Sequence, residues 1–254
     1  MKALTDILSE VQEKIAAAAA RAGRDVNDVE ILAVTKTHGE DVVREAWQSG
    51  LSIMAENKVQ EAAWKKPASP SGPSWHLIGH LQTNKVRQAL SLFDFIHSVD
   101  SIRLIEKLNT ISEETGARPG ILLEVNVSGE SSKTGMSPNE VDKAVELLLT
   151  SPRLSFEGFM TMAPFSDNPE DSRPFFRRLR QLRDDVEKRF SLSLPRLSMG
   201  MSNDYEVAVE EGATWLRLGT VLFGERPKIT KKTNVSFSGL DSYSGEGPTF
   251  KILD

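Results

Sequence analysis

A lysine placed directly after a short apolar run is the residue of this chain best suited to covalent chemistry. Residues 31–34 are apolar and rich in branched side chains, and a helical pattern begins near residue 40, which is typical of a buried strand in a parallel sheet. Lys36 would then lie at the carboxyl end of that strand, where α/β proteins place their ligand sites. Partial desolvation there favours the neutral amine, which forms an imine with a carbonyl group. The alternative is a lysine whose charged end extends into solvent.

Small and hydroxyl-bearing residues follow the last two strands that we expect, and they suit a phosphate. Glycine lets the backbone approach an anion closely, and hydroxyl groups add donors. Barrel enzymes often bind a phosphate with the loops after strands seven and eight. Small residues that merely form tight turns are the alternative. The seventh strand runs into Met199, Gly200, Met201 and Ser202, and the eighth runs into Gly219 and Thr220.

Arg217 lies within the eighth expected strand, two residues before Gly219, and therefore shares a face with it. An arginine inside a barrel strand needs a partner or a water-filled pocket. The alternative is an outward arginine that pairs with a carboxylate on a helix. A lysine, two phosphate-type loops and a strand arginine together suggest a ligand with an aldehyde, a phosphate and an ionisable ring. Pyridoxal 5′-phosphate (PLP) has these three features.

Alternating strands and helices must position these residues. Strict alternation favours a parallel sheet with helical crossovers, and eight units favour a single closed α/β barrel, the (β/α)8 or TIM barrel, over an open doubly wound sheet. An open sheet with one or two strands miscounted is the alternative. The barrel, preceded by a helix at residues 1–22, would span residues 1–227, and the polar residues 228–254 would form a mobile tail. We expect strands at residues 31–34, 53–55, 75–78, 93–99, 121–127, 154–160, 197–199 and 215–218.

The composition restricts the partners. The net charge of −5 argues against nucleic acid as the main partner, because no global positive field is available. No apolar run approaches the ~20 residues that span a bilayer, the N-terminus does not resemble a signal peptide, and cysteine is absent. We therefore expect a soluble, cytoplasmic protein that contacts no membrane. His76 and His80 lie on either side of a strand end, so we expect no metal pair there.

Seven separated stretches, between about residues 5 and 226, match in order those of a known family. They are AVTKTH (33–38), AENKVQE (55–61), WHLIGHLQTNK (75–85), LEVNVSGESSKTGM (123–136), FEGFMTM (156–162), LSMGMSNDYEVAVEEGATWLRLGT (197–220) and LFGER (222–226). They resemble the pyridoxal phosphate homeostasis protein family. The resemblance implies a (β/α)8 barrel similar to the N-terminal domain of alanine racemase, a fold-type III PLP protein, with PLP on the lysine after strand one.

The resemblance also implies a role for each candidate residue. Lys36 would hold the cofactor, Arg217 would face the pyridine nitrogen, and Asn57 would lie near the ring and its phenolic oxygen. An arginine at that nitrogen keeps it unprotonated and makes the ring a weaker electron sink. The phosphate would be surrounded by Ser202, Gly219 and Thr220, with the backbone of Met199, Gly200 and Met201 alongside.

One part of the alanine racemase pattern is missing. That enzyme has a second, β-rich domain with a tyrosine base, whereas only residues 227–254 follow Arg226, and Tyr205 and Tyr243 lie in a helix and in the polar tail. We therefore expect a non-catalytic, monomeric carrier without catalytic residues, which holds PLP as an internal aldimine, buffers it and releases it to apo-enzymes. The alternatives are a PLP-dependent amino-acid racemase of low activity and a phosphosugar-binding barrel without imine chemistry.

Overall fold

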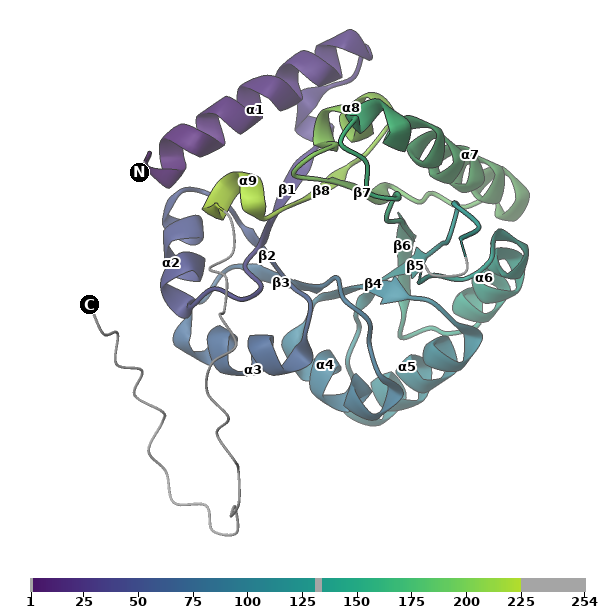
Figure 1. Cartoon of the computed structure of the whole chain (residues 1–254). Helices are drawn as coiled ribbons and strands as arrows, with labels where there is room; N and C mark the ends of the chain where they lie inside the picture. Colours follow the sequence, from purple (N-terminus) through teal and green to yellow (C-terminus); the bar gives the residue numbers. More distant parts are fainter. Residues whose placement is uncertain (1, 131–133, 225–254) are drawn as a thin grey trace, which may run out of the picture.

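Eight parallel strands close into a barrel in their order along the chain, with β8 paired to β1. The computed structural model describes residues 2–130 and 134–224. Figure 1 shows the strands around the barrel axis with the helices outside them. The predicted closed barrel is therefore confirmed, and the alternative of an open sheet is excluded. The strands are β1 (Glu30–Val34), β2 (Ile53–Glu56), β3 (Ser74–Leu77), β4 (Phe95–Val99), β5 (Gly120–Glu124), β6 (Ser155–Met160), β7 (Arg196–Met201) and β8 (Trp215–Leu218).

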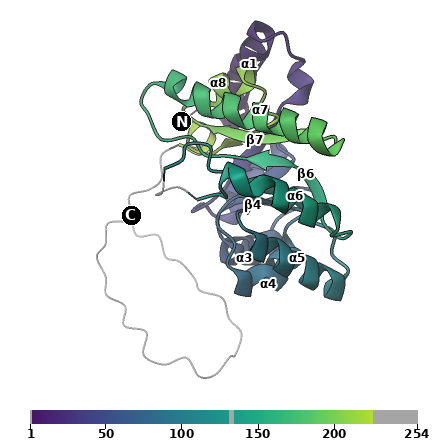
Figure 2. The same cartoon turned by 90° about the vertical axis from the view of Figure 1, so that its right-hand side faces the viewer.

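A helix follows each strand, and α1, which precedes β1, packs against α8 and α9. In α1 the apolar positions recur every three or four residues, so Leu4, Leu8, Val11 and Ile15 are buried on one face. Figure 2 shows α7 and α6 side by side on the outside of the barrel. The α-helices of the described residues are α1 (Leu4–Arg21), α2 (Glu40–Gln48), α3 (Val59–Ala68), α4 (Val86–Leu92), α5 (Ile102–Thr115), α6 (Val141–Leu149), α7 (Arg173–Phe190), α8 (Tyr205–Glu210) and α9 (Thr220–Phe223).

Three segments near the carboxyl ends of the strands differ from the sequence prediction. β5 ends at Glu124 rather than at residue 127, because the chain turns there and the N–H of Asn126 donates to the carbonyl of Met136 (3.0 Å). β7 continues to Met201, two residues beyond the predicted end at 199. The short helix α9 was not predicted, since four residues are too few to show a helical period.

The strand side chains form two apolar layers, because successive residues of a strand point to opposite faces. The outward-facing residues pack against the helices and form the larger core. The polar side chains of His76, His97, Ser198 and Arg217 share the inside of the barrel with a small apolar cluster. The members of that cluster are Leu32, Val34, Ile53, Ala55, Ile78, Leu122, Met160 and Trp215.

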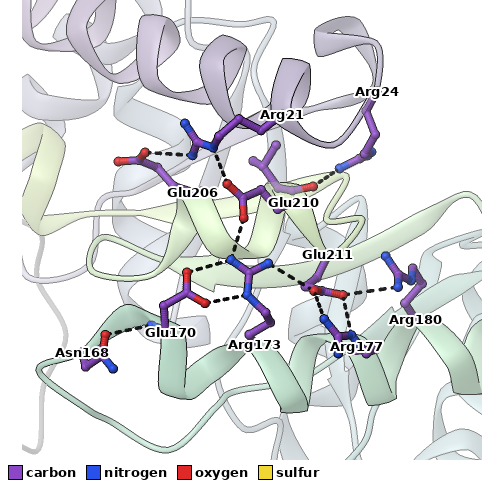
Figure 3. Close-up of polar contacts among 11 residues, drawn as sticks. Arg21, Arg24, Asn168, Glu170, Arg173, Arg177, Arg180, Glu206, Glu210 and Glu211 are labelled. Atoms are coloured by element: carbon purple, nitrogen blue, oxygen red, sulfur yellow. Dashed lines mark hydrogen bonds and ion pairs between the residues drawn. The ribbon is translucent and has the colours of Figure 1, made fainter.

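Ion pairs join α1, α7 and α8 on the outside of the barrel (Figure 3). Arg21 of α1 donates to Glu210 of α8 (2.6 Å), and Arg173 of α7 donates to the same carboxylate (2.6 Å). Arg173 and Arg177 both donate to Glu211, whose side chain is only 5% exposed. These contacts fix α8, and the loop that follows β7 leads directly into this helix.

Part of the predicted domain organisation lies outside the described residues. This applies to the boundary at residue 227, to the tail at residues 228–254 and to Tyr243, so these stay predictions. In the portion of the chain that is described, every helix is too short or too polar to cross a bilayer. The same portion contains no group of three or more His, Cys, Asp or Glu side chains placed to hold a metal ion.

Candidate functional site

The carboxyl ends of the strands surround a cavity of about 960 Å³. This is the end of a parallel barrel at which ligand sites occur, and the volume is typical of a small-molecule site. The residues of the wall come from the ends of seven of the eight strands, all except β4, so only the closed fold brings them together. Seven of the nine residues predicted for PLP line the cavity: Lys36, Asn57, Met201, Ser202, Arg217, Gly219 and Thr220.

The other two predicted residues, Met199 and Gly200, do not form part of the cavity wall. The side chain of Met199 is fully buried in the core between the barrel and the helices. Gly200 has a φ of +90°, and a Cβ atom there would lie 2.5 Å from the Cβ of Ala208, so only glycine fits. Any contact of these two residues with a ligand would therefore come from the backbone.

Lys36 is half-buried against the cavity, in the turn that follows β1. The next residue, Thr37, has a φ of 68°, which is rare for a β-branched residue. Its backbone N–H donates to the carboxylate of Glu61 (2.8 Å), and this bond stabilises the unusual conformation. The side chain of Lys36 therefore starts from a fixed backbone and lies along the cavity wall.

A second lysine, Lys65 of α3, contacts the same turn and has no solvent exposure. Its ammonium group donates to the carbonyl of Thr35 (2.8 Å), to the carboxylate of Glu56 (2.7 Å) and to the carboxylate of Glu61 (3.4 Å). Three donors thus meet three acceptors, as a buried ammonium group requires. Burial raises the pKa of Glu56, while the hydrogen bond from Lys65 opposes that rise. Lys65 supports the turn that carries Lys36 but does not line the cavity.

Arg217 points into the barrel and lines the cavity, although it is only 5% exposed. Its guanidinium group donates to the carbonyl and the hydroxyl of Ser198 (2.7 and 2.9 Å) and to the carbonyl of Thr161 (2.9 Å). Among the described residues no carboxylate pairs with it, which excludes the alternative of an outward arginine bound to a helix. Burial lowers the pKa of Arg217 to about 10, so it remains a cation at neutral pH.

The loops after β7 and β8 meet at Ser202. Its Oγ accepts a hydrogen bond from the backbone N–H of Val221 in α9 (3.1 Å), which leaves the hydroxyl proton for another acceptor. The carboxylate of Asp204 accepts from the N–H of Met201 (2.7 Å) and from the hydroxyl of Ser172 (2.9 Å), so the first loop is fixed as well. Hydroxyl and backbone donors held in this way suit a phosphate group.

An acidic residue that was not predicted as part of the site lies on the cavity wall. Glu124 is the last residue of β5, which lies across the barrel from β1 because the two strands are four apart in a ring of eight. Its carboxylate accepts a hydrogen bond from the hydroxyl of Thr134. Burial raises the pKa of Glu124, while that hydrogen bond opposes the rise. The apolar pattern of residues 121–127 predicts a strand that continues to residue 127, so nothing in that pattern marks a strand end at Glu124.

Comparisons with known proteins agree with this geometry. The family described as "Alanine racemase, N-terminal domain" matches residues 8–227. A pyridoxal phosphate homeostasis protein of Aquifex aeolicus (strain VF5) is 44% identical over 220 residues, which cover 86% of this chain and 96% of that protein. PipY of Synechococcus elongatus PCC7942, solved with PLP bound, superposes with a TM-score of 0.74 at 36% identity, covering 84% of this chain and 100% of its own.

A more distant structure shows how widely the fold is shared. An alanine racemase of Clostridium difficile 630 superposes with a TM-score of 0.67, and the match covers 86% of this chain and 57% of the racemase. The two sequences are only 14% identical, so this likeness shows the fold alone.

Proposed function

The chain belongs to the pyridoxal phosphate homeostasis protein family, as its motifs predicted, and from this premise we propose that it binds PLP and takes part in PLP homeostasis. One observation carries the proposal: an amine, a buried cation and two phosphate-type loops line a single cavity at the carboxyl end of the barrel. These groups match the aldehyde, the ring nitrogen and the phosphate of PLP.

The donor set fits the three polar parts of the cofactor. When bound, PLP would supply an aldehyde that condenses with the amine of Lys36. Arg217 would present its charge to the ring nitrogen, which then stays unprotonated because two adjacent positive charges repel. Asn57, at the exit of β2, would contact the phenolic oxygen. The phosphate would be held by Ser202, Gly219 and Thr220.

We propose a carrier rather than an enzyme. Efficient racemisation uses acid/base groups on both faces of the reacting carbon. Tyr205 is buried in α8 away from the cavity wall, and burial raises its pKa to about 12. Relatives of the chain are named homeostasis proteins. Glu124 favours the second candidate, a racemase of low activity, because it places an acid on the cavity wall across the barrel from β1.

The rim of the cavity supports release of the cofactor to other proteins. Phe165 is 81% exposed, and Met162 and Met201, which line the same opening, are 38% and 36% exposed. Apolar side chains gathered at one opening favour contact with another protein. We propose a cytoplasmic monomer that delivers PLP through this opening to apo-enzymes, with neither nucleic acid nor membrane as a partner.

A visible spectrum before and after borohydride tests PLP binding. The protein should gain a band at ~420 nm, which is typical of PLP bound to a lysine, and reduction should fix the cofactor on Lys36. Lys36→Ala should abolish the band, whereas Lys107→Ala, an exposed position on α5, should keep it. A band that survives in Lys36→Ala and is fixed on another lysine would refute the assignment. A colourless wild-type protein would favour the phosphosugar-binding barrel.

The carrier and the racemase differ in turnover. We expect the PLP-loaded protein to leave L-alanine essentially unchanged when the appearance of D-alanine is followed by chiral chromatography. Turnover above about 1 s⁻¹, an ordinary enzymatic rate, would contradict the carrier. Loss of that turnover in Glu124→Gln would then identify the acid that the enzyme uses.

A further inference from the structure

A chain of hydrogen bonds runs through the barrel interior from Arg217 to the opposite end of the strands. Arg217 donates to the Oγ of Ser198 (2.9 Å), which lies 2.9 Å from the Nδ1 of His97. The Nε2 of His97 lies 3.0 Å from the Nδ1 of His76, whose Nε2 lies 3.1 Å from the Oγ of Ser74. Since Ser74 is the first residue of β3, the chain extends from the cavity to the amino ends of the strands.

Arg217 fixes the direction of the first bond in this chain, because a guanidinium group only donates. The Oγ of Ser198 accepts from it, and among the described residues the Nδ1 of His97 is the acceptor within reach of the serine proton, so we assign that proton to this bond. The proton of His97 is then on Nε2 and is donated to the Nδ1 of His76, which in turn donates from its Nε2 to Ser74. The hydroxyl of Ser74 lies 3.3 Å from the carboxylate of Asp94. A buried cation is thus linked to a surface carboxylate through neutral groups that all donate in one direction.

Aromatic rings hold both imidazoles in place. Trp215 stacks on His97, with ring centroids 5.0 Å apart and an interplanar angle of 18°, and it meets His76 edge-on at 4.9 Å. Phe95 lies 4.5 Å from His76 on another side. Because both imidazoles are buried among these rings, neither can rotate without disturbing the packing of the barrel.

The surroundings keep both imidazoles neutral. Burial is the main cause, and it lowers the pKa of His76 to about 3 and that of His97 well below its ordinary value of 6.5. The charges that face the rings act in the same direction: Arg196 on the side of His76, and Arg217 on the side of His97. The carboxylate of Asp94 reaches His76 only through Ser74.

We propose that His97, supported by His76, is a positioning residue for Arg217. By accepting the proton of Ser198, it keeps the Oγ of that serine turned as an acceptor toward the guanidinium group, which is thereby held at the nitrogen side of the cofactor. Neither histidine lines the cavity, so both act through Arg217. The inference rests on the proposed function, but the chain itself exists without PLP and can be measured in the unloaded protein.

Nitrogen-15 NMR of the full-length protein without PLP tests the direction of the chain. We expect His76 and His97 each to show the neutral Nε2–H tautomer between about pH 6 and pH 8, because both rings are buried and neutral. Single His→Asn variants assign the signals. An Nδ1–H tautomer in either ring, or titration of either ring in that range, would overturn the directed chain.

Two substitutions of His97 separate positioning from packing. In His97→Asn the amide oxygen takes the place of Nδ1 and still accepts from Ser198, whereas His97→Leu leaves no acceptor. We expect His97→Leu to raise the dissociation constant for PLP about tenfold, roughly one hydrogen bond to a charged group, and to shift the absorption maximum. His97→Asn should stay within about twofold of wild type. Equal affinities and spectra in the two variants would overturn the inference.

Further variants keep the test decisive. If His97→Leu does not fold, Ser198→Ala removes the hydroxyl alone and should show the same tenfold loss. Ser112→Ala is its matched control, because Ser112 is a buried hydroxyl in α5 without a hydrogen-bond partner among the described residues. A wild-type protein that does not bind PLP would refute the proposed function, whereas a wild-type protein that binds PLP and a His97→Leu variant that matches it would refute this inference alone.

Discussion

Two buried cations lie near the carboxyl ends of the strands, and they are held in opposite ways. Lys65 bonds to the carboxylates of Glu56 and Glu61, and it faces the turn after β1 rather than the cavity. Arg217 bonds only to neutral oxygen atoms, those of Ser198 and Thr161, and it lines the cavity. Both are almost completely buried, so the difference lies in their partners.

This difference separates a supporting residue from a residue that we propose binds the ligand. A cation with a carboxylate about 3 Å away has little net field to offer a ligand, because the two charges cancel at a distance. A desolvated cation bonded only to neutral groups keeps its full charge, and the pKa of about 10 for Arg217 shows that burial disfavours that charge. The carboxylates of Asp204 and Glu124 oppose this effect only from a distance, without a hydrogen bond to Arg217. A buried charge without a directly bonded counterion is typical of functional sites, where a ligand supplies the interaction.

The largest effect is expected from Lys65→Met. This change leaves the carboxylate of Glu56 buried without its cation, and breaking a buried ion pair costs about 3–5 kcal/mol. We expect the free energy of unfolding in urea to fall by that amount, and PLP binding to weaken because the turn that carries Lys36 loosens. The double variant Lys65→Met with Glu56→Gln should recover most of the stability. A single variant as stable as wild type would show that this pair does not support the turn.

Arg217→Met should show the opposite pattern, with a large effect on binding and a small one on stability. It removes a cation that has no carboxylate partner, so the free energy of unfolding should change by less than about 1 kcal/mol. PLP affinity should fall about 100-fold, as expected for the loss of a buried charge interaction of about 2–3 kcal/mol. Arg173→Met, which breaks the outer ion pairs of Figure 3, should leave the affinity unchanged. Wild-type affinity in Arg217→Met would remove the distinction between the two cations.

Some residues near the cavity could be predicted from the sequence alone, and others could not. Arg217 was identified because it lies two residues before a glycine in a well-marked strand, and Lys36 because it follows an apolar run. Lys65 stands in a helix beside Trp64 and Lys66, where a lysine normally faces solvent, and its burial depends on how α3 packs on β2. The inward direction of His97 is likewise set by the closure of the barrel. Residues of this kind become visible only in the structure.

The fold was easier to predict than the site. The alternation of short apolar runs with helical patterns specifies eight strand–helix units, and the closed barrel has all of them. The ends of the strands were less certain, because a strand ends where its neighbour stops offering hydrogen-bond partners. One of these differences affects the site: β5 ends at Glu124, and the carboxylate of this residue lies on the cavity wall.

Acid should weaken the hydrogen-bond chain that runs from Arg217 through His97 to His76. The ion pair of Lys65 with Glu56 should not be weakened by a fall from pH 7 to pH 5. The pKa of His76 is about 3 in the folded protein and about 6.5 in the unfolded chain, so the folded state binds fewer protons between these values. Its contribution to stability is complete above pH 6.5 and is lost as the pH falls toward 3. Between pH 7 and pH 5 this loss is about 2 kcal/mol.

Urea unfolding at these two pH values, in wild type and in His76→Asn, isolates the effect. The asparagine oxygen still accepts from His97 but cannot take up a proton, so the variant should lose about 2 kcal/mol less than wild type on acidification. Glu56 has the opposite sign: burial raises its pKa above 4.5, so its contribution is present below that value and is lost as the pH rises. An equal loss in both proteins would show that His76 is not held neutral in the folded state.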